Sequence, residues 1–116
     1  NILNEAKLSL ENIERVQLGL HEVMQTGLGK NYINTSISSA GKTGTSETFV
    51  DTDNDGKMDT KTISTAFIMY APYENPEYSI VIMSPNISHT DSNNSYKYSI
   101  NLRVNKKITS YLFEKP

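Results

Sequence analysis

Hydrophobic positions near the start of the chain recur every three or four residues, which predicts an amphipathic helix. Ser9 is a suitable N-cap, and Gly27 and Gly29 follow the last periodic residue, where a helix is expected to stop. The sequence therefore predicts a helix over residues 10–26. Its apolar face is formed by Leu10, Ile13, Val16, Leu20, Val23 and Met24.

The middle of the chain has the pattern of β-strands. Residues 37–50 (ISSAGKTGTSETFV) are rich in Ser, Thr and Gly, which favours a strand that another group approaches closely. Residues 63–71 and 78–84 are almost continuously apolar, so we expect both of their faces to be covered.

Turn-like segments separate these strands. The first contains an Asp55-Gly56 pair, which is a hairpin signal, and the second runs from Pro72 to Pro76. We predict an antiparallel meander with strands at residues 39–50, 63–71 and 77–84. Residues 85–95 are polar and are expected to form a loop.

The last segment is ambiguous. Residues 96–104 alternate between apolar and polar, which is a strand pattern, whereas Ile100, Val104, Ile108 and Leu112 lie four apart, which is a helical one. The helical series is longer, so we predict a helix over residues 95–114. The predicted fold class is α+β, with a three-stranded antiparallel sheet flanked by N- and C-terminal helices.

Composition narrows the possible functions. Eleven Lys and Arg against thirteen Asp and Glu give a net charge of −2 on 116 residues, which argues against a nucleic-acid partner. The chain has no cysteine, which excludes disulfides, thiolate zinc sites and a cysteine nucleophile. We expect Met24, Met69 and Met83 to fill the core. The isolated His21 and His89 are expected at the surface or at a helix cap.

An acidic segment at residues 51–59 offers a possible cation site. Its acidic residues Asp51, Asp53, Asp55 and Asp59 occupy positions of a calcium-binding loop, with Gly56 at the turn. Thr62 stands where such a loop needs a bidentate Glu, and the predicted flanks are strands. We therefore favour a solvated hairpin and keep weak calcium binding as the alternative.

The tripeptide Lys42-Thr43-Gly44, followed by Thr45, carries the most specific chemistry. On an extended strand, Lys42 and Gly44 share one face, and the two threonines share the other. A lysine ammonium can assist proton movement at a serine nucleophile, and threonine hydroxyls can bind a carboxylate. A strand N–H can stabilise a developing oxyanion, and Gly44 lets a ligand come close to the backbone.

These residues resemble a motif of the serine D,D-transpeptidases, the penicillin-binding proteins, whose motif set is Ser-x-x-Lys, Ser-x-Asn and Lys-Thr-Gly. The stretches GKTGTSETFV and FIMYAPYENPEYSIVIM look like the last third of the catalytic domain of a class B enzyme. The preceding LENIERVQLGLHEVMQTGLG is similar to the helix that leads into this strand in the family. The resemblance covers about residues 8–114.

The resemblance implies roles for individual residues. Lys42 and Thr45 would be catalytic, with the Thr45 N–H completing the oxyanion hole. Thr43, Gly44 and Thr45 would bind the peptide or the β-lactam. The implied activity is cross-linking of peptidoglycan stem peptides by acyl transfer through a serine, with no cofactor. The implied location is the extracytoplasmic face of the bacterial membrane, with an N-terminal anchor helix that this sequence does not contain.

The other two family motifs have no convincing match. Ser39 to Lys42 fits Ser-x-x-Lys but overlaps the Lys-Thr-Gly strand, and we reject it. The two Ser-x-Asn matches, at residues 84–86 and 92–94, follow Lys-Thr-Gly, which is the wrong order. We therefore expect residues 1–116 to be a single incomplete domain, the C-terminal portion of a transpeptidase domain, and to be inactive alone.

Two kinds of partner follow from an incomplete domain. The missing N-terminal portion of the same enzyme would complete the sheet. Otherwise a homodimer could form through the bare edge of the strand at residues 78–84. Alternative functions are a serine β-lactamase or β-lactam sensor domain, and a non-enzymatic calcium-stabilised β module.

Overall fold

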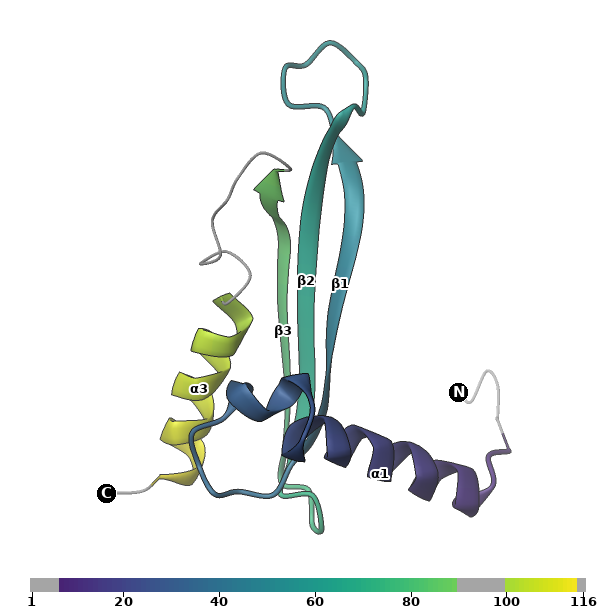
Figure 1. Cartoon of the computed structure of the whole chain (residues 1–116), viewed down its shortest axis with the longest axis vertical. Helices are drawn as coiled ribbons and strands as arrows, with labels where there is room; N and C mark the ends of the chain where they lie inside the picture. The colour runs from purple at the N-terminus through teal and green to yellow at the C-terminus, as the bar shows by residue number, and fades with distance from the viewer. Residues whose placement is uncertain (1–6, 90–99, 115–116) are drawn as a thin grey trace, which may run out of the picture.

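A computed structural model describes residues 7–89 and 100–114, and it shows a three-stranded sheet with helices packed near its base (Figure 1). This architecture confirms the predicted α+β class. The elements are α1 (Leu10–Gln25), η1 (Leu28–Tyr32, a 3-10 helix), β1 (Ala40–Val50), β2 (Thr60–Ala71), β3 (Tyr78–His89) and α3 (Ile100–Phe113).

The sheet is an antiparallel meander with strand order β1-β2-β3, as predicted. Residues opposite each other on antiparallel neighbours point to the same side of a sheet. One row, Thr43–Phe67–Ile82, lies on the side that α3 and η1 pack against, which we call the covered face. The next row, Lys42–Ile68–Val81, lies on the opposite side, the open face.

The hydrophobic core lies between the covered face and the helices. Its buried members are Met24, Phe67, Met69, Ala71 and Ile80. Tyr32 of η1 stacks on the ring of Phe67 with a centroid distance of 4.2 Å. The sequence did not predict η1, which closes the core through this aromatic contact.

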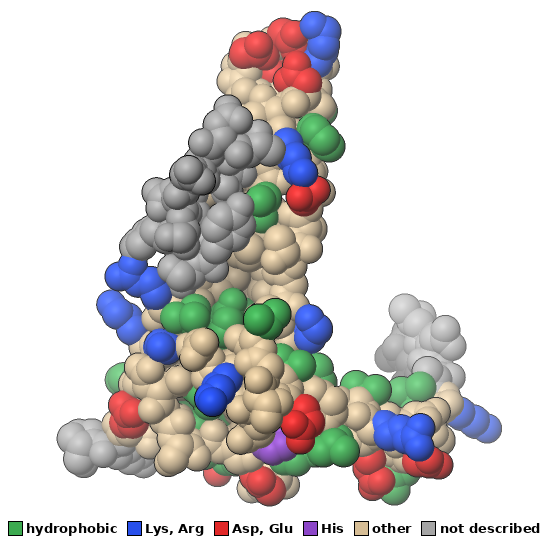
Figure 2. Space-filling model, viewed as in Figure 1, with side chains coloured by type: hydrophobic (Ala, Val, Ile, Leu, Met, Phe, Trp, Pro, Cys, Tyr) green, Lys and Arg blue, Asp and Glu red, His purple; other side chains and the backbone are tan. Residues whose placement is uncertain are grey.

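The open face carries exposed apolar side chains, so the prediction that both faces are covered is wrong for this chain. Ile68, Val81 and Met83 are 47%, 73% and 72% exposed. Met83 is therefore not a core residue, unlike Met24 and Met69. Figure 2 shows hydrophobic side chains gathered where the base of the sheet meets the helices.

Helix α1 begins and ends where the sequence predicted. The Ser9 hydroxyl accepts a hydrogen bond from the Asn12 N–H at 3.2 Å, which caps the first turn. Of the predicted apolar face, only Met24 is buried. The first turns extend away from the sheet (Figure 1), and Leu10, Ile13 and Val16 are exposed there. Among the described residues, no helix is both long and apolar enough to cross a membrane.

Strand β3 is longer than predicted. It continues to His89, so residues 85–89, which we expected in a loop, belong to the strand. The ladder with β2 is regular up to Ser84 opposite Thr65 and resumes at Ser88 opposite Ile63. Between these pairs the strand bulges, with Asn86 at φ 50° and its N–H donating to the Ser64 hydroxyl at 3.1 Å. The bulge accommodates Pro85, which has no N–H for a regular ladder.

Helix α3 packs through a polar face, which corrects the predicted orientation. The residues that it buries are Asn101, Asn105 and Thr109. Ile100 and Val104, which we placed on the apolar face, are exposed, whereas Ile108 and Leu112 are half-buried against the core. The part of the predicted helix before residue 100 lies outside the described residues.

Candidate active site

The Lys-Thr-Gly sequence lies on β1, at an edge of the sheet, which confirms the predicted strand. Lys42 and Gly44 pair with Ile68 and Ala66, and their side-chain positions therefore lie on the open face. Lys42 is exposed, and its Nζ donates to the Thr43 carbonyl at 2.7 Å. The ammonium is thus held close to the strand and faces solvent.

The two threonines lie on the other side of β1. Thr43 is half-buried opposite the core residue Phe67, whereas Thr45 is exposed opposite Thr65. The Thr45 hydroxyl is therefore the more accessible of the two to a ligand. The four predicted site residues occupy successive positions on one strand, so their side chains divide between the two faces.

Gly41 and Gly44 have different surroundings. A Cβ on Gly41 would lie 2.7 Å from the Ile68 carbonyl oxygen and 3.0 Å from the sulfur of Met24. A Cβ on Gly44 would meet only Ala66, at 3.8 Å or more, which is ordinary contact. The close approach predicted from the sequence is thus made by α1 at Gly41. At Gly44 the described residues leave space for a ligand.

A shallow hollow of about 210 Å³ lies beside Gly44 on the sheet. Gly44 and Ser46 of β1, Ala66 of β2 and Met83 of β3 contribute to its lining. Both apolar and hydroxyl groups line it, which suits a peptide-like ligand.

The rejected motif matches are structural residues. Ser39 is fully buried and lies at an odd position, so its side chain points away from the face that carries Lys42. The Ser84 hydroxyl donates to the Asn101 Oδ1 at 2.7 Å on the covered face. Residues 92–94 lie outside the described residues. None of the described matches brings a serine nucleophile to Lys42.

His21 has a role that sequence reasoning missed. It is half-buried, its Nδ1 lies 2.7 Å from the Ser39 carbonyl oxygen, and its ring stacks on Tyr73. The prediction of a surface or capping residue is therefore wrong. The only signal in the sequence was the position of His21 directly after Leu20 of the periodic apolar series.

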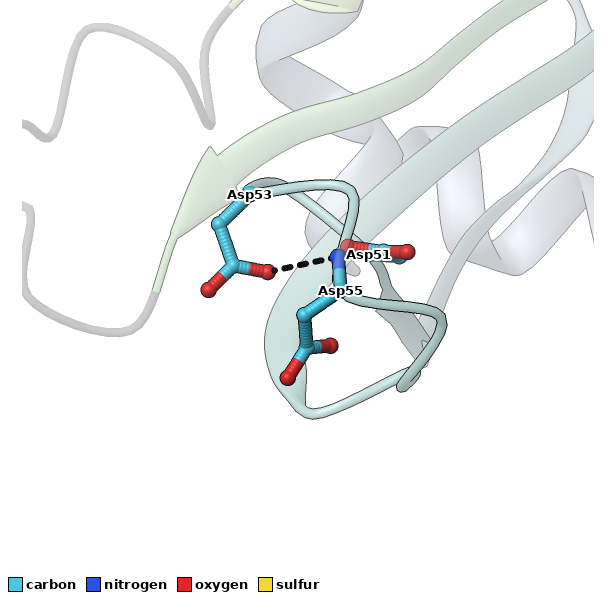
Figure 3. Close-up of side chains that lie close together, drawn as sticks. All are labelled: Asp51, Asp53 and Asp55. Atoms are coloured by element: carbon cyan, nitrogen blue, oxygen red, sulfur yellow. Dashed lines mark hydrogen bonds between the residues drawn. The ribbon is translucent and has the colours of Figure 1, made fainter.

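The acidic segment forms the loop at the far end of the β1–β2 hairpin (Figures 1 and 2). Carboxylate oxygens of Asp51, Asp53 and Asp55 all lie within 4.8 Å of one another (Figure 3). Asp59 is exposed and is not part of this group. Thr62 is buried in β2 and provides no carboxylate at the twelfth position of the loop.

Hydrogen bonds within this loop lower the pKa of two of its carboxylates. The Gly56 N–H donates to Asp51 Oδ2 at 2.8 Å, and this bond is the main reason that the pKa of Asp51 lies below its ordinary value. The Lys57 ammonium donates to Asp55 at 2.8 Å and lowers the pKa of that carboxyl. Gly56 has φ 86°, a conformation that glycine adopts without strain. Donors within the loop therefore satisfy carboxylate oxygens of Asp51 and Asp55.

Comparison with known proteins identifies the family. The sequence model of the family described as the penicillin-binding protein transpeptidase domain matches residues 1–109. The chain belongs to this family. Penicillin-binding protein 2A of Bacillus subtilis (strain 168) is 32% identical over 114 residues, which cover 97% of this chain and 16% of the relative. Penicillin-binding protein H of the same organism is 31% identical over 93 residues, which cover 80% of this chain and 13% of that relative.

A solved structure shows the same fold. Penicillin-binding protein 2B from Streptococcus pneumoniae (strain R6) superposes with a TM-score of 0.64 at 22% identity, covering 98% of this chain and 18% of that protein. The resemblance to the transpeptidase domain of class B penicillin-binding proteins is therefore confirmed. The chain spans less than a fifth of the length of the relatives that it matches.

Proposed function

We propose that residues 1–116 supply the Lys-Thr-Gly strand of a serine D,D-transpeptidase that cross-links peptidoglycan stem peptides. The observation that carries this proposal is the position of Lys42 and Gly44. They lie together on the open face of an edge strand, beside a hollow and with space above Gly44. An extended peptide or a β-lactam can approach such a strand from its free edge.

The proposed chemistry is acyl transfer through a serine of another segment. The serine oxygen attacks the penultimate D-Ala carbonyl, the terminal D-Ala leaves with a proton, and an amine of a second stem peptide then takes the acyl group. The Lys42 ammonium provides a positive field for the proton transfer. The Thr45 N–H stabilises the oxyanion, and the hydroxyls of Thr43 and Thr45 bind the substrate carboxylate. β-Lactams would acylate the same serine.

We propose that the rest of the same enzyme provides the serine and covers the open face. Lys42 points to the side on which Ile68, Val81 and Met83 are exposed. Apolar surface of this kind favours a packed partner, and a segment packed there would also lie next to the ammonium. Residues 1–116 alone would therefore be inactive. The complete enzyme would work at the extracytoplasmic face of the bacterial membrane.

The proposal is tested by replacing Lys42 with Ala in the complete enzyme. We expect labelling by a fluorescent penicillin to slow by about 100-fold, because the variant loses a charge aimed at the reacting atoms. Lys61→Ala is the matched control, because Lys61 lies on the neighbouring strand and pairs with Glu47 at 2.8 Å. Equal labelling by the Lys42 variant and the wild type would exclude the proposed role.

A serine β-lactamase or a β-lactam sensor is the second candidate, because either would use the same strand motif. The rate of deacylation separates them. We expect a transpeptidase or a sensor to release the penicilloyl group slowly and a β-lactamase to release it quickly. Transfer of a stem peptide to an acceptor amine then separates the transpeptidase from the sensor.

A further inference from the structure

Hydrogen bonds with three residues fix the position of Ser38 and Ser39, the two residues that lead into β1. The Tyr73 N–H donates to the Ser38 carbonyl at 2.9 Å, and the Ser38 hydroxyl donates to Glu74 at 3.0 Å. His21 Nδ1 lies 2.7 Å from the Ser39 carbonyl oxygen. We call His21, Tyr73 and Glu74 the entrance clamp, because they are hydrogen-bonded to the two residues immediately before Ala40, where β1 begins.

The bond from His21 satisfies a buried backbone group. Ser39 is fully buried and lies one residue before the ladder with β2 starts. A carbonyl oxygen only accepts hydrogen bonds, so Nδ1 of His21 carries the hydrogen. A buried carbonyl that loses its donor is strongly destabilising, and the chain would shift to find another.

The ring of His21 packs face to face against a second aromatic ring. It stacks on Tyr73 with a centroid distance of 4.1 Å and an interplanar angle of 12°. Tyr73 in turn lies beside Tyr70 of β2, with a centroid distance of 6.3 Å. The donor is therefore fixed in direction as well as in distance.

His21 joins α1 to the Lys-Thr-Gly strand in a way that apolar packing does not. Met24 of α1 also meets β1, where it packs over Gly41. Apolar contact has little directionality, whereas a hydrogen bond to a carbonyl fixes the position of the chain along its own axis. Lys42 is three residues beyond Ser39, roughly 10 Å along the strand.

We propose that His21 is a positioning residue for acylation. Through its hydrogen bond to the Ser39 carbonyl, His21 fixes the position of β1 along the strand axis relative to α1. The positions of the Lys42 ammonium and the Thr45 N–H are fixed with the strand. This inference rests on the proposed function, because the position of the strand matters only if a serine of the same enzyme reacts beside it. A displacement of about 1 Å at reacting groups can cost about 100-fold in rate, so a smaller shift has a measurable effect.

The test uses two substitutions that separate the ring from its donor. His21→Phe keeps the stack on Tyr73 and removes the N–H, whereas His21→Asn keeps an N–H near the position of Nδ1 and removes the ring. Stopped-flow acylation of the complete enzyme by a fluorescent penicillin gives the maximal acylation rate and the dissociation constant separately. We expect His21→Phe to lower the maximal rate about 3- to 10-fold with the dissociation constant unchanged, and His21→Asn to restore most of the rate.

The outcomes distinguish failure of the positioning role from failure of the proposed function. If Lys42→Ala slows labelling as expected and His21→Phe acylates at the wild-type rate, the positioning role is wrong and the proposed function stands. If both variants label normally, the proposed function itself is wrong. Equal losses in both His21 variants, in proportion to their loss of melting temperature, would reduce His21 to a purely structural residue.

A further variant covers the case in which His21→Phe does not fold. Tyr73→Leu keeps the hydrogen bond and removes the surface on which the imidazole rests. We expect a smaller loss of the maximal rate than in His21→Phe, again without a change in the dissociation constant. A loss of the maximal rate in His21→Asn as large as the loss expected for His21→Phe would overturn the proposal, because His21→Asn keeps the N–H.

Discussion

Gly41 and Gly44 lie on opposite faces of β1, and only Gly41 is required by packing among the described residues. The sulfur of Met24 and the Ile68 carbonyl occupy the space that a side chain at Gly41 would need. Gly44 has no comparable neighbour. Gly44 therefore has no packing role among the described residues, which leaves its position open for the ligand approach proposed above.

We predict that alanine at these two positions has opposite effects in the complete enzyme. Gly41→Ala should lower the free energy of unfolding by about 1–3 kcal/mol, because the new methyl group is forced against a backbone oxygen. Gly44→Ala should leave the melting temperature unchanged and slow acylation by about tenfold or more. Thermal melts and penicillin labelling measure the two effects. A wild-type acylation rate in Gly44→Ala would argue against ligand approach at this site.

At the scale of elements, α3 is attached to the sheet by amides and hydroxyls. Asn101 accepts from the Ser84 hydroxyl at 2.7 Å and donates to the Thr65 hydroxyl at 3.1 Å. Asn105 donates to the Tyr32 carbonyl at 2.9 Å. These directional contacts select one rotation of the helix, where an apolar stripe would allow several. Thr65 lies opposite Thr45, so the network also supports the site strand.

We predict that Asn101→Ala is strongly destabilising. The substitution removes two hydrogen bonds and leaves the Ser84 and Thr65 hydroxyls without this partner, at a cost of about 2–4 kcal/mol. Chemical denaturation of the complete enzyme would measure the loss. Lys107→Ala, on the exposed side of the same helix, is the control and should change stability by less than about 0.5 kcal/mol. Similar losses in both variants would contradict the role of the polar face.

We predict that the β1–β2 loop loses stability at acidic pH. The pKa of Asp51 is lowered in the folded loop, chiefly by the Gly56 N–H, so this stabilisation is present above the ordinary aspartate pKa of about 3.9 and is lost as the pH falls through the lowered value. Hydrogen exchange of the Gly56 amide between pH 5 and pH 2 would follow this change. In Asp51→Asn we expect weak protection at every pH. Protection that persists in wild-type protein at pH 2 would contradict this account.

Calcium should have little effect on the same loop. Three carboxylates lie close together, but Thr62 is buried where a calcium loop needs a bidentate Glu. We expect 1 mM calcium to raise the melting temperature by less than about 1 °C. A rise of several degrees that is lost in Asp53→Ala would support the calcium-stabilised alternative instead.

At the scale of the whole molecule, the described surface combines exposed apolar side chains with edge strands. Exposed apolar residues lie on α1 and on the open face of β2 and β3, and α1 meets the sheet at β1 near its base (Figure 1). Both β1 and β3 are edge strands of the sheet that the structure describes. Uncovered apolar surface and unpaired strand edges favour association.

We predict that the purified 116-residue chain self-associates. Sedimentation at rising concentration should show a dimer or larger species, either through the β3 edge or through the open face. The double variant Val81→Lys and Met83→Lys should shift the equilibrium toward monomer, because charged residues next to a strand edge oppose pairing. A wild-type chain that stays strictly monomeric at high concentration would contradict the prediction.

Local patterns predicted most of the elements. The period of α1, the Ser9 cap and the three strands follow from spacing and turn chemistry within short windows. The extension of β3 through Pro85 could not be predicted, because a bulge depends on the neighbouring strand. The buried face of α3 was predicted wrongly, because hydrophobic periodicity does not detect a helix that packs through Asn101 and Asn105.

The sequence by itself determined the family, the class of fold and the strand that holds the Lys-Thr-Gly motif, because motifs and periodicity are properties of neighbouring positions. Only the tertiary structure decided which face of each element is buried, why Gly41 and Gly44 differ, and that His21 is hydrogen-bonded to Ser39, immediately before the strand that carries Lys42. These features join residues that lie far apart in the chain. They depend on how helix and sheet meet in space, and no local pattern records that.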